Sequence, residues 1–226
     1  YDQTPATNVN ATFVFNQNVT EDENNIVEPQ DVAVDSADNV YVVCQAASTV
    51  KKFTASGVYV TNYGKFGGAA GQLNVPAGIA VDAAGYVYIG DRSDAREGRI
   101  QRWTNNGSFA APSPFYAPGG NDNFPVGLDF AGTNLYSSWI FTTANLDRIL
   151  AHAGGGTTAF QQSAADIGSY VYDVSVDYNG DLVAACSNGN VLFYSNINPG
   201  LAQTLAPNAT LTHTTAAYGI STDLFG

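Results

Sequence analysis

Short stretches of alternating apolar and polar residues, separated by turns rich in Gly, Asn and Asp, run through most of this chain. The clearest stretch is 76–103, where Ile79 and Val81 alternate with Ala80 and Asp82. Apolar residues at every second position predict β-strands with one buried face. The stretch therefore predicts three short strands joined by two turns. One such piece cannot bury its own faces and must pack against others like it.

The same pattern occurs four times, and a fifth copy begins near the C-terminus. The aligned positions are Asp31, Gly78, Gly127, Asp173 and Gly219, at spacings of 47, 49, 46 and 46 residues. A period of this length with four strands per copy is typical of a β-propeller, in which each copy forms one blade. We therefore expect an all-β fold, a β-propeller of four-stranded antiparallel blades with four complete repeats and a partial fifth.

The sequence divides into an N-terminal part, residues 1–28, and a single repeat domain, residues 29–226. The N-terminal part is polar apart from one alternating run, 11–15, and it contains an acidic linker. Closed propellers often build their last blade from an N-terminal outer strand and C-terminal inner strands, which removes exposed sheet edges. Residues 11–15 and 218–223 fit these positions in a fifth blade whose two middle strands are missing.

The second repeat resembles an NHL repeat. The residues at the recurrent positions of that repeat are Pro76, Gly78, Asp82, Gly85, Asp91, Arg99 and Ile100. The resemblance extends over 29–223, strongly in two copies and loosely in two. Three copies lack the Asp at the end of the second strand, and Cys44 and Cys186 stand at or next to that place. The family implies a propeller, usually of six blades, and implies no single activity, because fold analogy does not assign function.

Cys44 and Cys186 occupy equivalent places in the first and fourth copies. A disulfide would require their Cα atoms to lie within about 7 Å, which separate blades do not provide unless the two copies are neighbours. We therefore expect two buried, reduced cysteines that behave as small apolar residues. An intact disulfide would instead indicate a small ring.

Composition and charge narrow the partners and the location. The net charge of −12 and the absence of a Lys/Arg cluster argue against nucleic acid or an anionic membrane, both of which need a basic face. The chain contains no run of about 20 apolar residues and does not begin with a signal peptide, so we expect no membrane insertion and a mature or excised form. Few lysines, no methionine and four Asn-x-Ser/Thr sequons favour an extracellular or cell-surface protein with N-linked glycans. The sequons begin at Asn10, Asn18, Asn106 and Asn208.

Candidate catalytic and metal-binding residues are sparse. His152 and His213, the two histidines, fall in different predicted loops, so they cannot form a three-histidine metal centre such as that of the amidating lyase that resembles this family. No Gly-x-Ser-x-Gly motif supports a hydrolase. The turns 35–39 and 177–181 carry closely spaced oxygen donors, but Asp and Asn are also preferred turn residues. We expect no catalytic residue, no metal site and no cofactor, with Ca²⁺ as the alternative.

We interpret the chain as a secreted, N-glycosylated, non-enzymatic propeller that self-associates, as a homo-oligomer or polymer, in an extracellular assembly such as a fibril. The strands expected to associate contain Phe13, Val14 and Phe15 at one end and Gly219, Ile220 and Ser221 at the other. Three explanations fit the incomplete blade: excision from a longer chain, irregular closure of a small ring, or completion by a neighbour's strand.

Two other functions remain open. One is a glycan- or peptide-binding module with Tyr116, Tyr170, Tyr172 and Tyr218 rimming one face. The other is a metal-dependent enzyme like the lyases or lactonases, with Ca²⁺ or Zn²⁺ on the axis.

Overall fold

The protein forms antiparallel β-sheets and, in the part that the structure describes, no helix. The computed structural model describes residues 26–93, 97–111, 115–117, 123–141, 148–153, 157–163, 169–177, 179–195, 197, 206–213 and 215–222. These residues contain no helix long and apolar enough to cross a membrane. The expected all-β class is confirmed. The expected strand at 11–15 lies outside the described residues.

Each of the four sheets is formed by one sequence repeat, and the sheets are called blades 1 to 4. Blade 1 contains β1 (Pro29–Val34), β2 (Val40–Cys44), β3 (Thr49–Phe53) and β4 (Tyr59–Tyr63). Blade 2 contains β5 (Ile79–Val81), β6 (Val87–Arg92) and β7 (Gly98–Trp103). Blade 3 contains β8 (Asn123–Ala131), β9 (Asn134–Phe141), β10 (Arg148–Ala153) and β11 (Thr157–Ser163). Blade 4 contains β12 (Val171–Val176), β13 (Leu182–Cys186), β14 (Asn190–Tyr194) and β15 (Ala209–Thr212).

An aspartate at the end of the first strand shapes the first hairpin in blades 1 and 2. The Asp35 Oδ1 atom accepts hydrogen bonds from the backbone N–H groups of Ala37 and Asn39, both at 2.9 Å. Asp82 makes the equivalent bonds in blade 2. Gly85 has a φ of +83°, which glycine adopts without steric cost. These local bonds explain why sequence alone located the two turns.

The hydrophobic core lies between consecutive blades. One cluster, which includes Tyr41, Tyr63 and Trp103, joins blades 1 and 2. A second, around Trp139, joins blades 2 and 3, and a third, which includes Tyr194, joins blades 3 and 4. All five side chains are at most 1% exposed. Blades 2 and 3 are therefore packed on both faces, whereas blades 1 and 4 each pack one face in these clusters.

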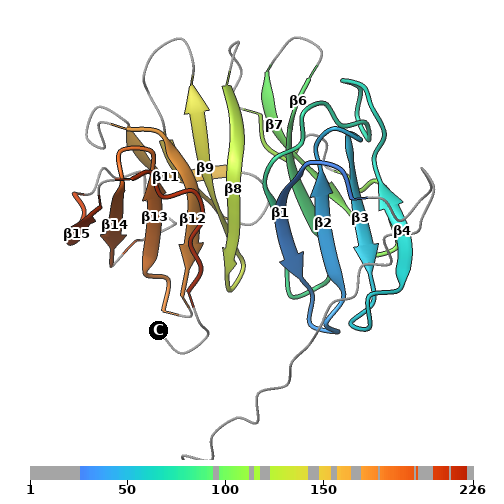
Figure 1. Ribbon diagram of the computed structural model, residues 1–226, viewed down its shortest axis with the longest axis horizontal. Helices are drawn as coiled ribbons and strands as arrows, with labels where there is room; N and C mark the ends of the chain where they lie inside the picture. The colour runs from blue at the N-terminus through green and yellow to red at the C-terminus, as the bar shows by residue number, and fades with distance from the viewer. Residues whose placement is uncertain are drawn as a thin grey trace, which may run out of the picture.

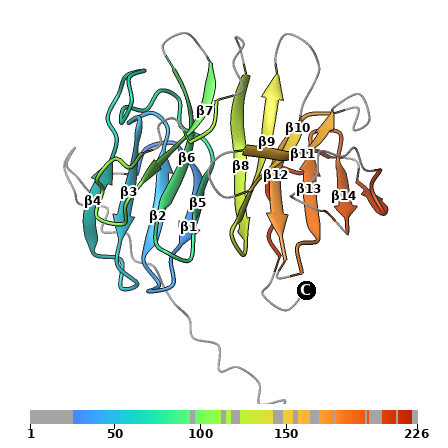
Figure 2. The ribbon, with the colours of Figure 1, turned by 180° about the vertical axis from the view of Figure 1, so that it is seen from behind.

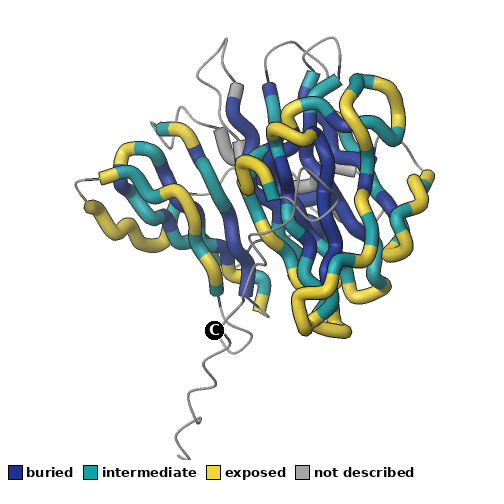
Figure 3. The backbone as a smooth tube through the Cα atoms, turned by 45° about the vertical axis from the view of Figure 1, so that its right-hand side comes forward, coloured by how far each residue is buried: buried dark blue, intermediate teal, exposed yellow. Residues whose placement is uncertain are grey.

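The blades follow one another around an axis. β1 contacts β5, β5 contacts β8, and β8 contacts β12. β1, β8 and β12 lie toward the middle of the molecule, and β4 and β15 lie at its opposite ends (Figures 1 and 2). Exposed residues gather on the outer strands and turns, and buried residues fill the interior (Figure 3). The described residues do not close the ring between blades 1 and 4.

Three local features differ from a regular four-stranded blade. In blade 2 the fourth strand is reduced to isolated bridges, Ile100 with Tyr116 and Trp103 with Phe109, as expected for a Pro-rich segment. The fourth strand of blade 4, β15, was not located from sequence. Residues 218–222 do not form the expected regular strand. No described segment forms a backbone hydrogen-bond ladder with these residues, so they are not a β-strand of any sheet.

Candidate functional site: the ring axis and its open side

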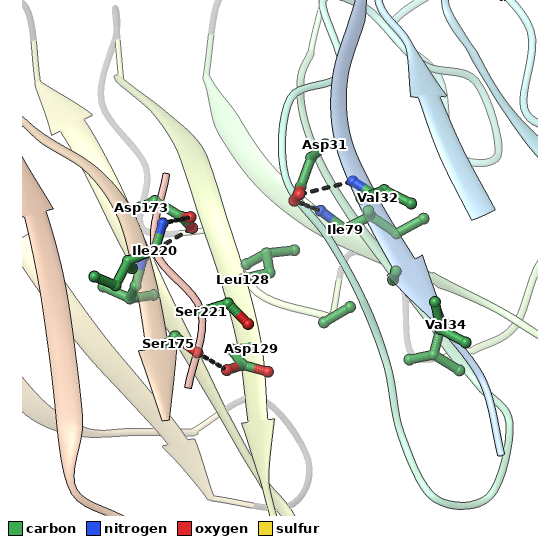
Figure 4. Close-up of a pocket in the computed structure, with 14 residues that line it drawn as sticks. Asp31, Val32, Val34, Ile79, Leu128, Asp129, Asp173, Ser175, Ile220 and Ser221 are labelled. Carbon is green, nitrogen blue, oxygen red and sulfur yellow. Dashed lines mark hydrogen bonds between the residues drawn. The ribbon is translucent and has the colours of Figure 1, made fainter. Parts of the chain in front are cut away.

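The first strands surround a pocket of about 360 Å³ on the axis of the ring. Its walls come from β1, β5, β8 and β12, together with residues 220–221. Asp31 and Val34 lie on one side of this space, and Asp173, Ser175 and Ile220 lie on the other (Figure 4). Five chain segments, one from each repeat, therefore share a single axial pocket.

Two carboxylates at equivalent repeat positions connect neighbouring blades. Asp31 accepts backbone N–H bonds from Val32, 2.8 Å, and from Ile79 of blade 2, 2.9 Å. Asp173 of blade 4 accepts an N–H bond from Ile220 at 2.9 Å, and its other oxygen binds the residue that follows it. Ile79 and Ile220 each come directly after the aligned glycine of their repeat. The segment around Ile220 is thus held against blade 4 as β5 is held against blade 1.

Asp129 makes a similar connection between blades 3 and 4. Its Oδ1 atom accepts the N–H of Phe130 at 2.8 Å, and its Oδ2 atom accepts the N–H of Val176 at 2.8 Å and the Ser175 hydroxyl at 3.0 Å. The Ser175 Oγ atom also accepts the N–H of Thr222 at 3.0 Å. A hydrogen-bonded path therefore runs from blade 3 through blade 4 to residues 220–222.

The axial carboxylates are hard to ionise. Burial is the main cause that raises the pKa of Asp31 to about 7, and the charges of Asp173 and Asp129 add to it against the opposing backbone hydrogen bonds. Burial also raises the pKa of Asp173 to about 6 and that of Asp129 above its ordinary value. Each carboxylate uses both oxygens to accept backbone N–H groups, an arrangement suited to joining strands. In the described part of the chain, His, Cys, Asp and Glu residues form no group of three that could hold a metal ion.

The two turns considered for Ca²⁺ use their carboxylates locally. Hydrogen bonds from Asn39, Tyr41 and Ala37 outweigh the opposing effect of burial and lower the pKa of Asp35. Asp177 accepts the N–H of Asp181 at 2.8 Å across the equivalent turn of blade 4. Both contacts are those expected of turn residues.

The structure also brings together a Ser–His pair that sequence reasoning missed. His152 lies in β10 and is fully buried, so its predicted place in a loop is wrong. Its Nε2 atom lies 2.8 Å from Ser137 Oγ, which accepts a hydrogen bond from Trp139 Nε1 at 2.7 Å. Cross-strand pairing of β9 with β10 creates this contact, and no local sequence signal indicates it. Burial lowers the pKa of His152 to about 3, so the imidazole is neutral. Both side chains of this pair are fully buried.

The resemblance residues Asp91 and Arg99 form a buried ion pair, Arg99 Nε to Asp91 Oδ1 at 2.9 Å. Gln101 donates to the same carboxylate, and Arg99 also donates to the backbone oxygens of Gly68 and Gln72. Burial outweighs these partners and raises the pKa of Asp91 to about 6. The network attaches the loop after blade 1 to blade 2, which is a structural role.

Two of the predicted glycosylation sites lie in the described part of the chain. Asn106 and Asn208 are both exposed. The side-chain oxygen of Asn106 accepts the N–H of Ser108, and that of Asn208 accepts the N–H of Ser195. These bonds do not use the side-chain nitrogen, to which an N-linked glycan is attached. Asn10 and Asn18, like Phe13, Val14 and Phe15, lie outside the described residues.

Cys44 and Cys186 are buried, and no disulfide joins them. Burial raises the pKa of the Cys44 thiol. The cysteines therefore agree with the expected reduced, structural state.

The tyrosines expected to rim one face do not gather in one place. Tyr116 is partly buried against the cluster between blades 2 and 3, with its ring 4.5 Å from that of His152 and 5.5 Å from that of Trp139. Tyr172 and Tyr218 stack at 5.0 Å, and Tyr218 is 72% exposed. The stacked Tyr172–Tyr218 pair lies next to residues 219–222, at the side where the described residues leave the ring open.

No family model matches the sequence, and no curated protein matches it. Many solved structures do resemble the fold. A chain of a nidogen/laminin complex aligns with a TM-score of 0.61 and 15% identity, covering 87% of this chain and 85% of that chain. An aldose sugar dehydrogenase from Streptomyces coelicolor aligns with a TM-score of 0.58 and 15% identity, covering 88% and 72%. A gluconolactonase from Xanthomonas campestris aligns with a TM-score of 0.57 and 19% identity, covering 84% and 64%.

The neighbours thus include a protein–protein complex and enzymes, and a streptogramin B lyase is among them with a TM-score of 0.56 and 14% identity. The alignment with that lyase covers 75% of this chain, which spans about half of the lyase chain. Likenesses at 11–19% identity show the fold and do not establish an activity or the NHL family. Together with the successive antiparallel blades and the shared axial pocket, they show that this chain has a β-propeller fold.

Proposed function

We propose that the chain is a non-enzymatic interaction propeller, extracellular and N-glycosylated, that self-associates when a neighbouring copy completes its unfinished blade. The observation that carries this proposal is the position of residues 219–222. They occupy the place of a first strand beside β12, through the Asp173–Ile220 and Ser175–Thr222 bonds. No described strand pairs with either edge of this segment. Free backbone groups at such an edge favour pairing with an added strand.

The chemistry of the axis supports binding over catalysis. The three axial carboxylates accept backbone N–H groups, and the buried Ser137–His152 pair has no solvent access. The likeness to a lyase, a lactonase and a dehydrogenase concerns the fold. A metal-dependent reaction on the axis would require ligands beyond these occupied carboxylates, and metal bound after purification without chelators would support that alternative.

The exposed Asn106 and Asn208 support the glycoprotein part of the proposal. Mass spectrometry of the native protein before and after enzymatic removal of N-linked glycans tests it. Glycans on both residues are the expected result, and unmodified peptides covering both sequons would contradict it.

Self-association is tested with the substitution Ile220→Pro, because proline removes the N–H that Asp173 accepts and distorts the backbone on which an added strand would pair. Light scattering over a range of concentrations should show oligomers for the unchanged chain and fewer for the variant. Ser221→Ala, which keeps the backbone N–H groups, is the matched control. A monomer at high concentration, with hydrogen exchange protection at both 11–15 and 218–222, would contradict self-association.

The stacked Tyr172–Tyr218 pair favours a second candidate function, recognition of a glycan or peptide at the open side. Aromatic faces bury apolar area while their hydroxyl groups stay wet, which suits such ligands. A glycan and peptide array would distinguish this function. Binding that is lost in Tyr218→Ala, with the oligomeric state unchanged, would favour it over self-association.

A further inference from the structure

The face of blade 4 that points away from blade 3 carries apolar residues, of which Ala185 is fully buried, Val183, Val191 and Phe193 are partly buried, and Leu211 is exposed. Cross-strand register places Val183 beside Phe193 and Ala185 beside Val191, and Val191 pairs in turn with Leu211. Their neighbours along each strand face the cluster between blades 3 and 4. Leu211 is 63% exposed. This surface, called the blade 4 wall, continues outward from residues 219–222.

The outward face of blade 1 is apolar on its first two strands, and the buried Lys51 of β3 lies beside Val42 on the same face. Val32 pairs with Val42, and Val34 pairs with Val40, while the alternate residue Ala33 packs toward blade 2. Val32 and Val34 are 57% and 56% exposed although they lie on a first strand that lines the axial pocket. This surface is called the blade 1 wall. In blades 2 and 3 the corresponding faces are covered by the preceding blade.

Glycines at the aligned position show how closely successive first strands approach. A Cβ atom on Gly78 would lie 2.6 Å from the Val126 carbonyl oxygen of blade 3, and one on Gly127 would lie 2.6 Å from Asp173 Oδ1 of blade 4. Among the described residues, a Cβ on Gly219 would meet no atom closer than 3.8 Å, and that atom belongs to Asp173 of the preceding blade. At Gly127 the neighbouring space is filled by Asp173 of the following blade. At Gly219 no described residue fills the equivalent space.

Asp31 suits that open place. Gly127 precedes a blade that carries Asp173 at the aligned position, and Gly219 would precede blade 1, which carries Asp31 there. Residues 220–221 and β1 already line one pocket with the other first strands. Segments from all five repeats therefore line the axis, and residues 220–221 occupy the first-strand place of the fifth.

We propose that the ring closes at five blades, and that a strand from a second copy, residues 11–15, enters between the blade 1 wall and the blade 4 wall to build blade 5 on residues 219–222. This inference rests on the proposed self-association and specifies its interface. Phe13, Val14 and Phe15 are consecutive apolar residues, which is typical of strands buried on both faces. A strand between two apolar walls needs this pattern.

The chain leading to this strand can reach another molecule. The described part begins at Ile26, and the Glu28 carbonyl oxygen accepts a hydrogen bond from Gln45 N just after β2. The ten residues 16–25 span at most about 35 Å when extended. That length allows residues 11–15 to extend beyond the blade to which they are attached.

The first test replaces both exposed valines of the blade 1 wall, Val32→Thr with Val34→Thr. Threonine keeps the branched shape that favours strands, but its hydroxyl lacks a partner once a strand covers it. Analytical ultracentrifugation should show self-association weakened at least about tenfold, with the urea midpoint of the monomer unchanged. Val58→Thr, at a position 60% exposed in the β3–β4 turn, is the matched control.

The second test is Gly219→Ala, which probes the number of blades. The added methyl group has space in the isolated chain but would meet Asp31 in a five-bladed ring, as a methyl on Gly127 would meet Asp173. We expect unchanged monomer stability and self-association weakened at least about tenfold. Unchanged association in both variants would overturn the five-bladed interface while leaving self-association itself in place.

Cross-linking distinguishes a second copy from the same chain. Copies with Val14→Cys are mixed under oxidising conditions with copies carrying Ser221→Cys, while the buried Cys44 and Cys186 remain in both. A disulfide-linked heterodimer supports the proposal, and Ser56→Cys in the exposed β3–β4 turn replaces Ser221→Cys as the control. A double variant that carries both Val14→Cys and Ser221→Cys tests the same chain. A disulfide formed within single molecules of this variant, without mixed dimers, would overturn both strand exchange and the proposed self-association.

Discussion

Single carboxylates determine how this propeller is held together. Asp35 and Asp82 cap turns within a blade, Asp31 and Asp173 join first strands, and Asp91 neutralises a buried arginine. All of these residues are aspartates, and their roles differ because each carboxylate has a different degree of burial and different hydrogen-bond partners. Sequence indicated the turn residues because their partners lie two to four residues away. It placed Asp31, Asp91 and Asp173 at repeat positions but did not indicate their roles, because their partners lie up to 48 residues away.

Asp91→Asn should destabilise the protein strongly. The substitution leaves Arg99, which is nearly fully buried, without a compensating charge. Losing one partner of a buried ion pair costs about 3–5 kcal/mol. Urea unfolding measures this loss. Asp38→Asn, in an exposed turn at a φ of +59° that Asn tolerates, should change stability little. Equal effects of the two substitutions would contradict the assignment.

His152 should make the protein less stable in acid. Its pKa is about 3 in the fold against an ordinary value of 6.5, so the unfolded chain binds the proton more readily between these values. The contribution of His152 is fully present above pH 6.5 and is lost as the pH falls toward 3. His152→Gln should therefore reduce the loss of stability between pH 6.5 and 4, relative to the unchanged chain, in urea unfolding. The exposed His213→Gln is the control, and an unaltered pH profile in His152→Gln would contradict this explanation.

At the scale of elements, the hairpins follow from local sequence and the blade junctions do not. β1 to β7 lie at or within a few residues of the strands that the alternation predicts. β8 and β9 are longer, because their ladder continues through the bulge between Pro125 and Gly127. The strand expected at 218–223 has no ladder over its described residues, 218–222, because alternation predicts which residues face inward but not whether a partner strand lies alongside.

Gly127→Ala should weaken the junction between blades 3 and 4. The new methyl group would lie 2.6 Å from Asp173 Oδ1 and 2.8 Å from the Cα atom of the same residue, so backbone must move. Overpacking of this kind costs about 1–3 kcal/mol. Gly219→Ala, at the aligned position with open space, serves as the control in thermal unfolding of the monomer. Equal melting temperatures for the two variants would show that the close approach at Gly127 is not needed.

At the scale of the whole molecule, the axis gathers carboxylates from blades 1, 3 and 4, and the open side carries the exposed apolar residues Val32 and Val34 of blade 1 and Leu211 of blade 4. The acidic axis disfavours ionisation, and the walls favour a partner strand. Both properties arise because the repeats are arranged around one axis, so that first strands distant in sequence become neighbours.

The axial carboxylates should make the fold more stable in mild acid than at neutral pH. The pKa values of Asp31 and Asp173, about 7 and 6, are raised from 3.8, so the folded chain binds more protons than the unfolded chain between these limits. Their contribution is largest near pH 4 and declines as the pH rises toward 7. His152 opposes this trend, so the test compares variants. Asp31→Asn should make the urea midpoint fall less between pH 4.5 and 7.5, and an unchanged slope would contradict the role of Asp31.

The sequence by itself determined the all-β class, the repeat length, most hairpin turns and the pattern of buried positions, because these depend on alternation and on bonds between near neighbours. The tertiary structure alone decided that Asp31, Asp129 and Asp173 share an axis, that Ser137 meets His152, and that residues 219–222 occupy a first-strand place without a ladder. Those contacts depend on how whole blades pack, and packing of one blade on another is set by faces that no single repeat contains.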